Sequence, residues 1–242
     1  MVPPCDPAAE AVFRPVRAGN ALEVTVERLL CAIRLGVVAA GERFPAERDL
    51  AVRFGIGRIT LREAIRHLQR QGYVESRRGR RGGTFVAKMP PRPTPDEALR
   101  DLAESGTDLE GLLAYRRGLE TGAVVLLAEA GLTAEQTLLL ERRLTETEAA
   151  GAGDYRRCDT VLHITLARMT GSPQMATALA DARMRVNRLM DTVPPNEDGI
   201  ADSDGQHRAI AHAVAERDPE AARRALGGHL STVEGRLRSL LG

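Results

Sequence analysis

The sequence contains no tryptophan, and its phenylalanines, tyrosines and tryptophans together make up only 3% of 242 residues. Its core must therefore be aliphatic and rich in alanine, a composition that favours helices. The longest purely apolar run, at 123–128, has six residues. A transmembrane helix needs about 20, so we expect no membrane-spanning segment.

Cysteine is equally scarce. Cys5, Cys31 and Cys158 are far apart, odd in number and form no CxxC pair. This pattern excludes a disulfide framework and predicts a reduced, cytoplasmic protein. The first residues contain Asp6 and Glu10 and lack a basic region, so we expect no secretory signal.

A net charge of only +1 argues, at first, against a nucleic-acid partner. The charge is unevenly distributed, however. Residues 14–88 hold 16 basic and 7 acidic side chains, a net charge of +9, whereas residues 89–242 hold 18 basic and 24 acidic ones, a net charge of −6. A basic region of this kind is typical of phosphate binding, although a merely solvated basic face is the alternative.

Four prolines between residues 88 and 95 indicate a stiff, extended linker at the point where the charge changes sign. We therefore predict an N-terminal extension at 1–19, a DNA-binding domain at 20–88, a proline-rich linker at 89–95 and a helical domain at 96–242.

The basic region has the pattern of a winged helix. Apolar periodicity predicts helices at 21–35, 47–54 and 58–71, and a glycine-containing turn at 55–57 joins the last two. Short strands at 73–76 and 84–87 flank a tip rich in arginine and glycine. Arg58 and Arg62 lie on one outer face of the third helix, with Thr60 beside them, where a recognition helix contacts DNA. A winged helix that binds protein is the alternative.

Four segments carry a resemblance to a known family: GERFPAERDLA at 41–51, GRITLREA at 57–64, GYV at 72–74 and GTFV at 83–86. They resemble the GntR family of bacterial transcriptional regulators. Gly57 stands where that family usually has serine, which removes a side-chain cap from the third helix. The resemblance implies that the operator contacts come from the recognition helices and the wing, that is, from Arg48, Arg58, Thr60, Arg62, Gly79, Arg80 and Arg81.

Beyond the linker the pattern is helical throughout. We predict helices at 96–104, 108–130, 134–150, 154–170, 174–192, 203–217 and 219–241. Their breaks contain glycine or proline, and Asp218-Pro219 is an N-cap followed by a helix-starting proline. The segment 191–205 is predicted to be a solvated loop, with a cover over a site as the alternative. The fold class is therefore mainly α, with a winged helix-turn-helix followed by an antiparallel helical bundle.

The spacing of four side chains predicts a metal site in this bundle. Asp159 and His163 are four residues apart, so they project from one helical face. His207 lies 11 residues before Asp218 and His229 lies 11 after it, so a hairpin about Asp218 would bring both to the same height. One carboxylate and three imidazoles suit one divalent transition metal per chain, with Zn²⁺ first and Ni²⁺ or Mn²⁺ as alternatives. Ordinary surface histidines are the competing interpretation.

A second resemblance rests on RRGLE at 116–120, DTVLH at 159–163, TGSP at 170–173 and HRAI at 207–210. These segments resemble the FCD effector-binding domain of the FadR-like GntR regulators, an antiparallel bundle of six or seven helices. The resemblance assigns the metal ligands to Asp159, His163, His207 and His229. It also implies a small carboxylate effector held by Arg116. Arg117 is the alternative partner, and Asn187 lies either in the pocket or on the surface.

The leading hypothesis is a metal-containing transcriptional regulator, a homodimer on a pseudo-palindromic double-stranded DNA operator, and a repressor released by a small organic acid. A metal-dependent hydrolase is disfavoured, because the sequence has no HExxH motif and no acid that spacing places beside the ligands. A constitutive DNA-binding protein with a structural metal is the third possibility. We therefore expect no enzyme activity.

Overall fold

The computed structural model describes residues 21–79, 82–89, 92–104, 106–192 and 197–241. The chain forms two compact units. The N-terminal unit takes in the chain up to Leu30 together with Gly41–Lys88. The helical unit takes in Cys31–Ala40 together with the chain from Met89 onward. The domain boundaries expected from composition stay predictions, and the extension at 1–19 lies outside the described residues.

Within its described residues, the N-terminal unit contains three helices and a hairpin: α2 (Ala21–Arg34, whose last residues belong to the helical unit), α3 (Glu47–Phe54), α4 (Arg58–Arg70), β1 (Val74–Arg77) and β2 (Gly83–Val86). The two strands pair antiparallel, from Val74 opposite Val86 to Arg77 opposite Gly83. Gly55 ends α3 in the left-handed conformation, with φ of 65°, which a glycine adopts without strain. The helix-turn-helix and wing predicted from the sequence are therefore present.

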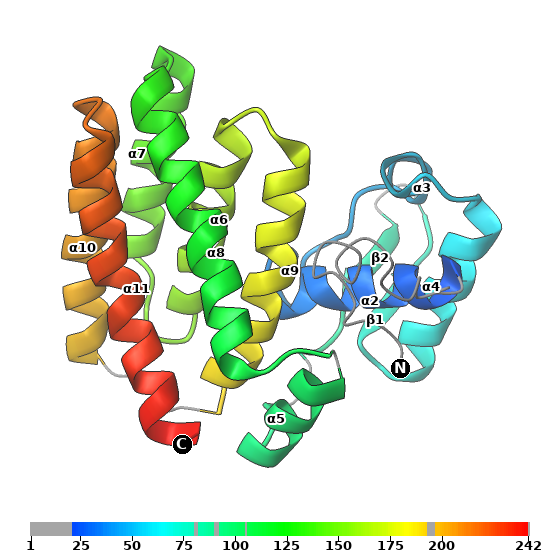
Figure 1. Cartoon of the computed structure of the whole chain (residues 1–242). Coiled ribbons are helices and arrows are strands. Elements are labelled where there is room, and N and C mark those ends of the chain that lie inside the picture. Colours follow the sequence, from blue (N-terminus) through cyan, green and yellow to red (C-terminus); the bar gives the residue numbers. More distant parts are fainter. Residues whose placement is uncertain (1–20, 80–81, 90–91, 105, 193–196, 242) are drawn as a thin grey trace, which may run out of the picture. The chain divides into compact units, whose positions relative to one another are not determined.

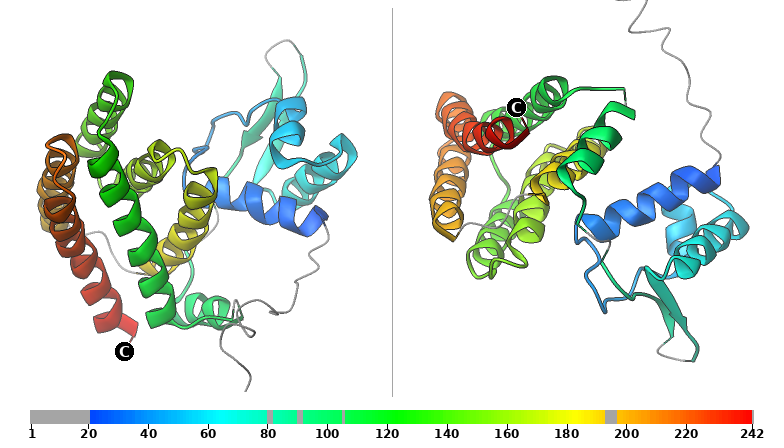
Figure 2. Two further views of the ribbon diagram at one scale, coloured as in Figure 1. Left: turned by 45° about the horizontal axis from the view of Figure 1, so that its top comes forward. Right: turned by 90° about the horizontal axis from the view of Figure 1, so that it is seen from below.

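The described part of the helical unit contains seven further helices, which form an antiparallel bundle (Figures 1 and 2), as predicted. They are α5 (Pro95–Glu104), α6 (Leu109–Ala130), α7 (Ala134–Glu148), α8 (Tyr155–Met169), α9 (Pro173–Met190), α10 (Glu197–Ala215) and α11 (Pro219–Leu241).

Side-chain caps start several of these helices. The Asp218 carboxylate accepts a hydrogen bond from the Ala221 N–H at 2.9 Å, as its position before Pro219 predicted. Asp108 caps α6 through the Gly111 N–H, and Thr133 starts α7 with a capping box. These caps satisfy N–H groups that have no partner within the helix and so mark where these helices begin.

One predicted boundary is wrong. Helix α10 begins at Glu197, six residues before the predicted start at 203, so much of the predicted loop at 191–205 is helical. Two glycines, Gly199 and Gly205, weaken the local helical signal, but Gly199 is buried and packing of the first turns outweighs its low propensity. Residues 193–196 lie outside the described part of the chain.

The core is aliphatic, as the scarcity of aromatic residues predicted. Leucine, alanine, valine and isoleucine side chains from α6, α7, α8, α10 and α11 form its largest cluster, and Leu226 and Leu230 there are fully buried. A second cluster joins α5, α6, α9 and α11. Among the described helices, none is both long and apolar enough to cross a membrane.

Candidate metal centre and nucleic-acid interface

The bundle brings together the four side chains predicted to bind a metal. Asp159 and His163 lie on α8, His207 on α10 and His229 on α11. One ligand atom from each can be chosen so that all four lie within 4.8 Å of one another. The three histidines are almost completely buried, so the alternative of ordinary surface histidines does not describe them.

The hairpin of α10 and α11 explains why His207 and His229 meet. Both lie 11 residues from Asp218, and their ring centroids are 4.6 Å apart. The His163 ring lies 5.0 Å from the His229 ring and 5.2 Å from the His207 ring. Leu162 and Leu230, the neighbours of His163 and His229 in the sequence, are themselves buried in the aliphatic core.

Hydrogen bonds on the outer side of the rings orient His163 and His229. The His163 Nδ1 contacts the Glu120 carboxylate, and the His229 Nδ1 lies 3.0 Å from the amide oxygen of Gln206. Both partners accept hydrogen bonds, so each Nδ1 carries the proton and each Nε2 keeps its lone pair. This arrangement is the usual support for a metal-ligating histidine.

The inner nitrogens face each other and Asp159. The Nε2 atoms of His163 and His207 are 3.2 Å apart, and the Asp159 Oδ1 lies 3.2 Å from the His207 Nε2. The His229 Nε2 is buried and has no hydrogen-bond partner within the described chain. Burial, and then the neighbouring His163 and His207, hold the pKa of His229 well below its usual value, so its imidazole is neutral. A buried nitrogen lone pair without a partner, in a cluster of three imidazoles and one carboxylate, fits a metal ligand.

A buried ionic network surrounds this cluster. Arg183 pairs with Asp159, and its Nη1 lies 3.1 Å from the Glu120 Oε1. The Arg116 Nε donates to the same Glu120 oxygen at 2.7 Å. Burial alone would raise the pKa of Asp159, but the Arg183 guanidinium, together with the neighbouring His163 and His207, holds it well below its usual range. The carboxylate is therefore ionised.

Glu120 is held ionised in the same way. Burial would raise its pKa, but Arg116, His163 and Arg183 together lower it well below the usual value. Two acids and two arginines thus balance in charge within the bundle. Such a network is costly to bury but strongly destabilising to leave half-paired.

Glu120 and Arg183 are the residues that sequence reasoning missed. Glu120 lies four residues after Arg116, a spacing that places both on one helical face and could have signalled the pair. Arg183 lies four residues before Asn187, but neither the motifs nor the spacing rules single it out.

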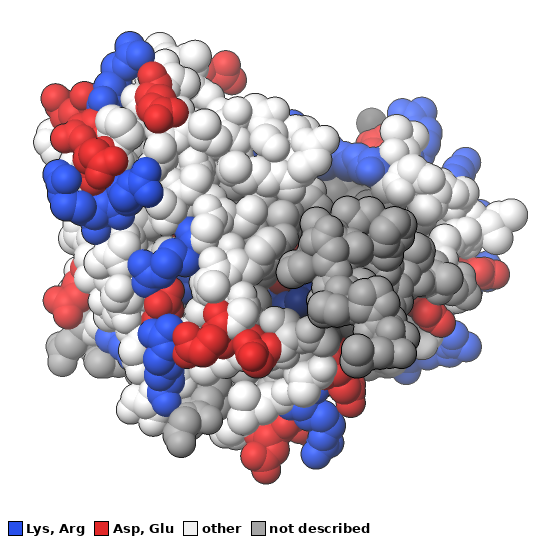
Figure 3. Space-filling view, viewed as in Figure 1, with Lys and Arg blue, Asp and Glu red and all other residues white. Residues whose placement is uncertain are grey.

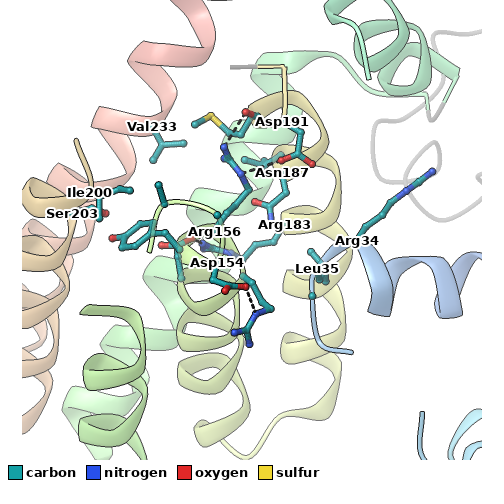
Figure 4. Close-up of a pocket in the computed structure, with 18 of the residues that line it drawn as sticks. Arg34, Leu35, Asp154, Arg156, Arg183, Asn187, Asp191, Ile200, Ser203 and Val233 are labelled. Carbon is teal, nitrogen blue, oxygen red and sulfur yellow. Dashed lines mark hydrogen bonds and ion pairs between the residues drawn. The ribbon is translucent and has the colours of Figure 1, made fainter. Parts of the chain in front are cut away.

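A cavity of about 610 Å³ opens beside the cluster (Figure 4), and all the residues that line it belong to the helical unit. Asp159 and His229 reach it from the metal cluster, and Arg116, Arg183 and Asn187 line it as well. Two of the four predicted ligands are therefore accessible from this space.

The predicted effector residues differ in how freely they face this cavity. Arg116 is 3% exposed; its Nε is committed to Glu120, while its Nη1 is buried and has no hydrogen-bond partner in the described part of the chain. Asn187 lines the cavity and donates to the Thr160 hydroxyl at 2.8 Å, so it is not a surface residue. Arg117 pairs instead with Glu234 at 2.8 Å and does not line the cavity, which disfavours it as the alternative partner.

The predicted DNA contacts in the N-terminal unit are exposed or half-buried. The Arg48 side chain is 82% exposed, and Arg58 is exposed at the start of α4. The Arg62 Nε donates to the Glu47 carboxylate at 2.8 Å, while Thr60 is half-buried. Gly57 provides no side-chain cap to α4, as its lack of a hydroxyl predicted.

In the wing, Gly79 is exposed and has a φ of 104°, in the left-handed region that favours glycine. Arg80 and Arg81 lie outside the described residues. Over the helical unit, by contrast, basic and acidic side chains are intermixed on the face shown in Figure 3.

Each of the two units matches a known protein family. Residues 22–86 match the family described as bacterial regulatory proteins, gntR family, and residues 111–232 match the FCD domain. The chain is 30% identical to the HTH-type transcriptional regulator RmpR of Mycobacterium gastri over 93% of its own length and 82% of that protein. It is 31% identical to the HTH-type transcriptional repressor NanR of Citrobacter rodentium, over 94% of the chain and 89% of that protein.

The fold is also that of a solved regulator. The structure of E. coli McbR/YncC aligns with a TM-score of 0.53 and 18% identity, over 93% of this chain and all of that one. At that identity the likeness concerns the fold alone. The two family matches and the identity to RmpR and NanR show the family and the function. The chain belongs to the GntR family of bacterial regulatory proteins, carries an FCD domain, and is a DNA-binding transcriptional regulator and not an enzyme.

Proposed function

We propose that this regulator is a metal-containing repressor that a small organic carboxylate releases from its operator. The observation that carries the proposal is the cluster of Asp159, His163, His207 and His229, in which the buried His229 Nε2 has no partner in the described chain. The cluster adjoins a cavity lined by arginines, so a metal site and an anion site would share one space.

These four residues would hold one divalent transition metal per chain. Three imidazoles and one carboxylate suit Zn²⁺, with Ni²⁺ or Mn²⁺ as alternatives. When bound, such a metal supplies a Lewis acid that can hold the carboxylate of an organic acid. Glu120 and Gln206 keep the His163 and His229 rings in the tautomer that leaves Nε2 free.

Arg116 and Asn187 are the proposed effector contacts. The unpartnered Nη1 of Arg116 can donate to an anion in the cavity, and Asn187 is fixed at the cavity wall by its bond to Thr160. Arg183 reaches the same space, although Asp159 and Glu120 already occupy part of its guanidinium. Two hydrogen-bond donors beside a Lewis acid favour a carboxylate over a neutral ligand.

A purely structural metal is the competing proposal. Structural zinc sites are closed, with every coordination position filled by protein. Here Asp159 and His229 both line a cavity large enough for an organic acid. That accessibility favours an effector site.

The DNA-binding part of the proposal rests on the N-terminal unit. We infer that a cytoplasmic homodimer places two copies of α4 on a pseudo-palindromic operator. The operator contacts would be Arg48, Arg58, Thr60, Arg62 and Gly79, together with Arg80 and Arg81. The relative NanR is a transcriptional repressor by name, which supports repression as the mode of regulation here. Release requires that the acid bind the DNA-free state more tightly than the DNA-bound state.

Metal analysis of the purified full-length protein tests this proposal. We expect one metal per chain by mass spectrometry, and a rise in melting temperature when Zn²⁺ is added to chelator-treated protein. The variant His229→Ala should lose both. His212→Ala is the matched control, because His212 is an exposed histidine on α10 outside the cluster.

The carboxylate is tested second, by titrating organic acids into the metal-loaded protein. Added stabilisation by an acid, with a parallel fall in operator affinity, supports the effector site. If metal stabilises the protein and no acid adds to it, the metal is structural. If wild type and His229→Ala hold equal amounts of metal, the four-residue site is wrong.

A further inference from the structure

The cavity extends well beyond the histidine cluster, and its lining repeats at a regular interval. On α8, Arg156 lies seven residues before His163; on α10, Ile200 lies seven before His207; on α11, Arg236 lies seven after His229. Arg156, Ile200, Arg236 and His229 all line the cavity. Seven residues are two helical turns, or about 10 Å along the axis, on nearly the same face.

The cavity therefore has two layers of side chains. We call the first, built from Asp159, His163, His207 and His229, the histidine layer. We call the second, built from Arg156 and Arg236, the arginine layer. Ile200 and Arg236 each lie 18 residues from Asp218, so the α10–α11 hairpin aligns them just as it aligns His207 and His229.

Arg156 is held in place within the arginine layer. Its Nε lies 3.1 Å from the Asp191 Oδ1, and its Nη2 donates to the Met190 carbonyl at 3.1 Å. Figure 4 shows the side chain reaching across the cavity to Asp191. Its charge is thus largely matched by one acid, and these two contacts use only its Nε and Nη2.

Arg236 differs, because within the described chain it has neither an ion pair nor a hydrogen bond, although it is half-buried. Its guanidinium lies directly over Gly199 of α10. A methyl group at position 199 would overlap that guanidinium, so only glycine lets Arg236 occupy this place. Gly199 has a low helical propensity, but its lack of a side chain leaves room for the Arg236 guanidinium beside the cavity.

The charges of the two layers differ in consequence. Around the histidine layer, Arg116 and Arg183 are matched by Glu120 and Asp159. In the arginine layer, Asp191 matches Arg156, and the described chain offers no acid to Arg236. A half-buried cation that faces a cavity without a counter-charge favours an anion from outside the chain.

We propose that the effector is a dianion, with one acidic group in the histidine layer and a second bound by Arg236 and Arg156 in the arginine layer. This inference rests on the effector site proposed above and adds the chemical class of the effector. A volume of about 610 Å³ has room for an acid that spans both layers. A carboxylate and a phosphate share the chemistry that two guanidiniums recognise, so both are compared below.

The test is calorimetric titration of the full-length, metal-loaded protein. The probes are glutarate, adipate and pimelate, the matching monocarboxylates pentanoate, hexanoate and heptanoate, and 3-phosphoglycerate. We expect at least one dianion to bind about tenfold more tightly than its matching monoanion, which corresponds to about 1.4 kcal/mol. In Arg236→Gln that advantage should vanish, while the affinity for monocarboxylates changes less than twofold.

Two matched controls accompany this variant. Arg224→Gln removes an exposed arginine of the same helix outside the cavity, and should leave the dianion preference intact. Gly199→Ala should reproduce the loss seen in Arg236→Gln, because it displaces the guanidinium. Gly205→Ala is its control, since a methyl group at 205 on the same helix meets no other atom.

The outcomes separate this inference from the metal site. Tight binding of 3-phosphoglycerate alone, lost in Arg236→Gln, assigns the second acid as a phosphate and supports the inference. A dianion preference that persists in Arg236→Gln, or a wild type that takes no probe or does not discriminate, overturns it. The titrations are repeated on metal-free protein: a preference that depends on Arg236 in a protein without metal affinity refutes the metal centre and leaves the dianion site standing.

Discussion

The N-terminal unit exposes the arginines that are predicted to contact DNA, whereas the helical unit buries the arginines beside its proposed metal site. The side chains of Arg48 and Arg62 are 82% and 53% exposed, and those of Arg116 and Arg183 are 3% and 2% exposed. Exposed arginines keep their hydration and can meet a polyanion at little cost. Buried arginines must be paired within the chain, so their charge positions other groups before any ligand arrives.

The difference shows how one residue type serves two purposes in this regulator. In the N-terminal unit, the excess of basic side chains would provide long-range attraction to DNA and contacts to its phosphates. In the helical unit, Arg183 holds Asp159 ionised beside the three imidazoles of the cluster. Removing an arginine should therefore affect binding in the first unit and stability in the second.

The largest effect is expected on operator binding. Arg58→Ala or Arg62→Ala should lower operator affinity by about 2–6 kcal/mol, because the proposed homodimer would lose one contact of about 1–3 kcal/mol in each half-site. The measurement is fluorescence anisotropy on a duplex selected from random sequence by the wild type. The fold should be unchanged, since both side chains are exposed.

Arg53→Ala is the control for these two variants, because Arg53 is an exposed arginine of α3 outside the predicted contacts. If both Arg58→Ala and Arg62→Ala still bind the selected duplex specifically and with salt-dependent affinity, the assignment of α4 as the recognition helix is wrong.

A buried arginine should matter most for stability. Arg183→Met leaves Asp159 without its guanidinium and weakens the support of Glu120, so we expect the free energy of unfolding to fall by about 3–5 kcal/mol. Urea unfolding of the metal-free protein, followed by circular dichroism, measures the loss.

Arg208→Met provides the contrast. Arg208 pairs with Glu141 at 2.6 Å and Glu148 at 2.5 Å, but on the surface, so its removal should cost less than about 1 kcal/mol. Equal losses for Arg183→Met and Arg208→Met would show that burial does not separate the two kinds of arginine.

A smaller effect is expected from pH in the metal-free protein. Burial, with His163 and His207, lowers the pKa of His229 in the folded chain, so the unfolded chain binds the proton more readily. The contribution of His229 to the free energy of unfolding is therefore fully present above the unfolded pKa of about 6.5. It declines as the pH falls below that value, by about 1 kcal/mol over the first pH unit.

Urea midpoints measured between pH 7.5 and 5.5 test this dependence. His229→Gln should flatten the profile, whereas His212→Gln, which changes an exposed histidine of α10, should not. A wild-type profile that is flat down to pH 5.5 would contradict a neutral, buried His229.

The predictable part of this molecule is the part encoded by short-range pattern. Helical periodicity and the breaks at glycine or proline predicted α6 to α9 and α11. The equal separation of His207 and His229 from Asp218, 11 residues each, predicted that the two side chains lie close together. The role of Arg183 and the start of α10 could not be predicted from the sequence, because both depend on packing between segments far apart in the chain. Arg183 meets Asp159 and Glu120 from another helix, and Gly199 is helical only because its buried position outweighs its propensity.

The smallest expected effect concerns the cap of the recognition helix, where the N-terminal unit differs from its family's usual sequence. Gly57 has φ of −67° and ψ of 146°, which any residue adopts, and a side chain there would meet no other atom. Gly57→Ser should therefore add a hydroxyl acceptor for the open N–H groups of α4, and stabilise the N-terminal unit by a few tenths of a kcal/mol. Thermal unfolding of the full-length protein measures the gain, with Gly57→Ala as the control that adds a side chain without an acceptor. A serine that stabilises no more than alanine would show that water already satisfies this helix end. Gly57 would then cost no stability relative to serine, and α4, which carries the exposed arginines Arg58 and Arg62, would need no side-chain cap.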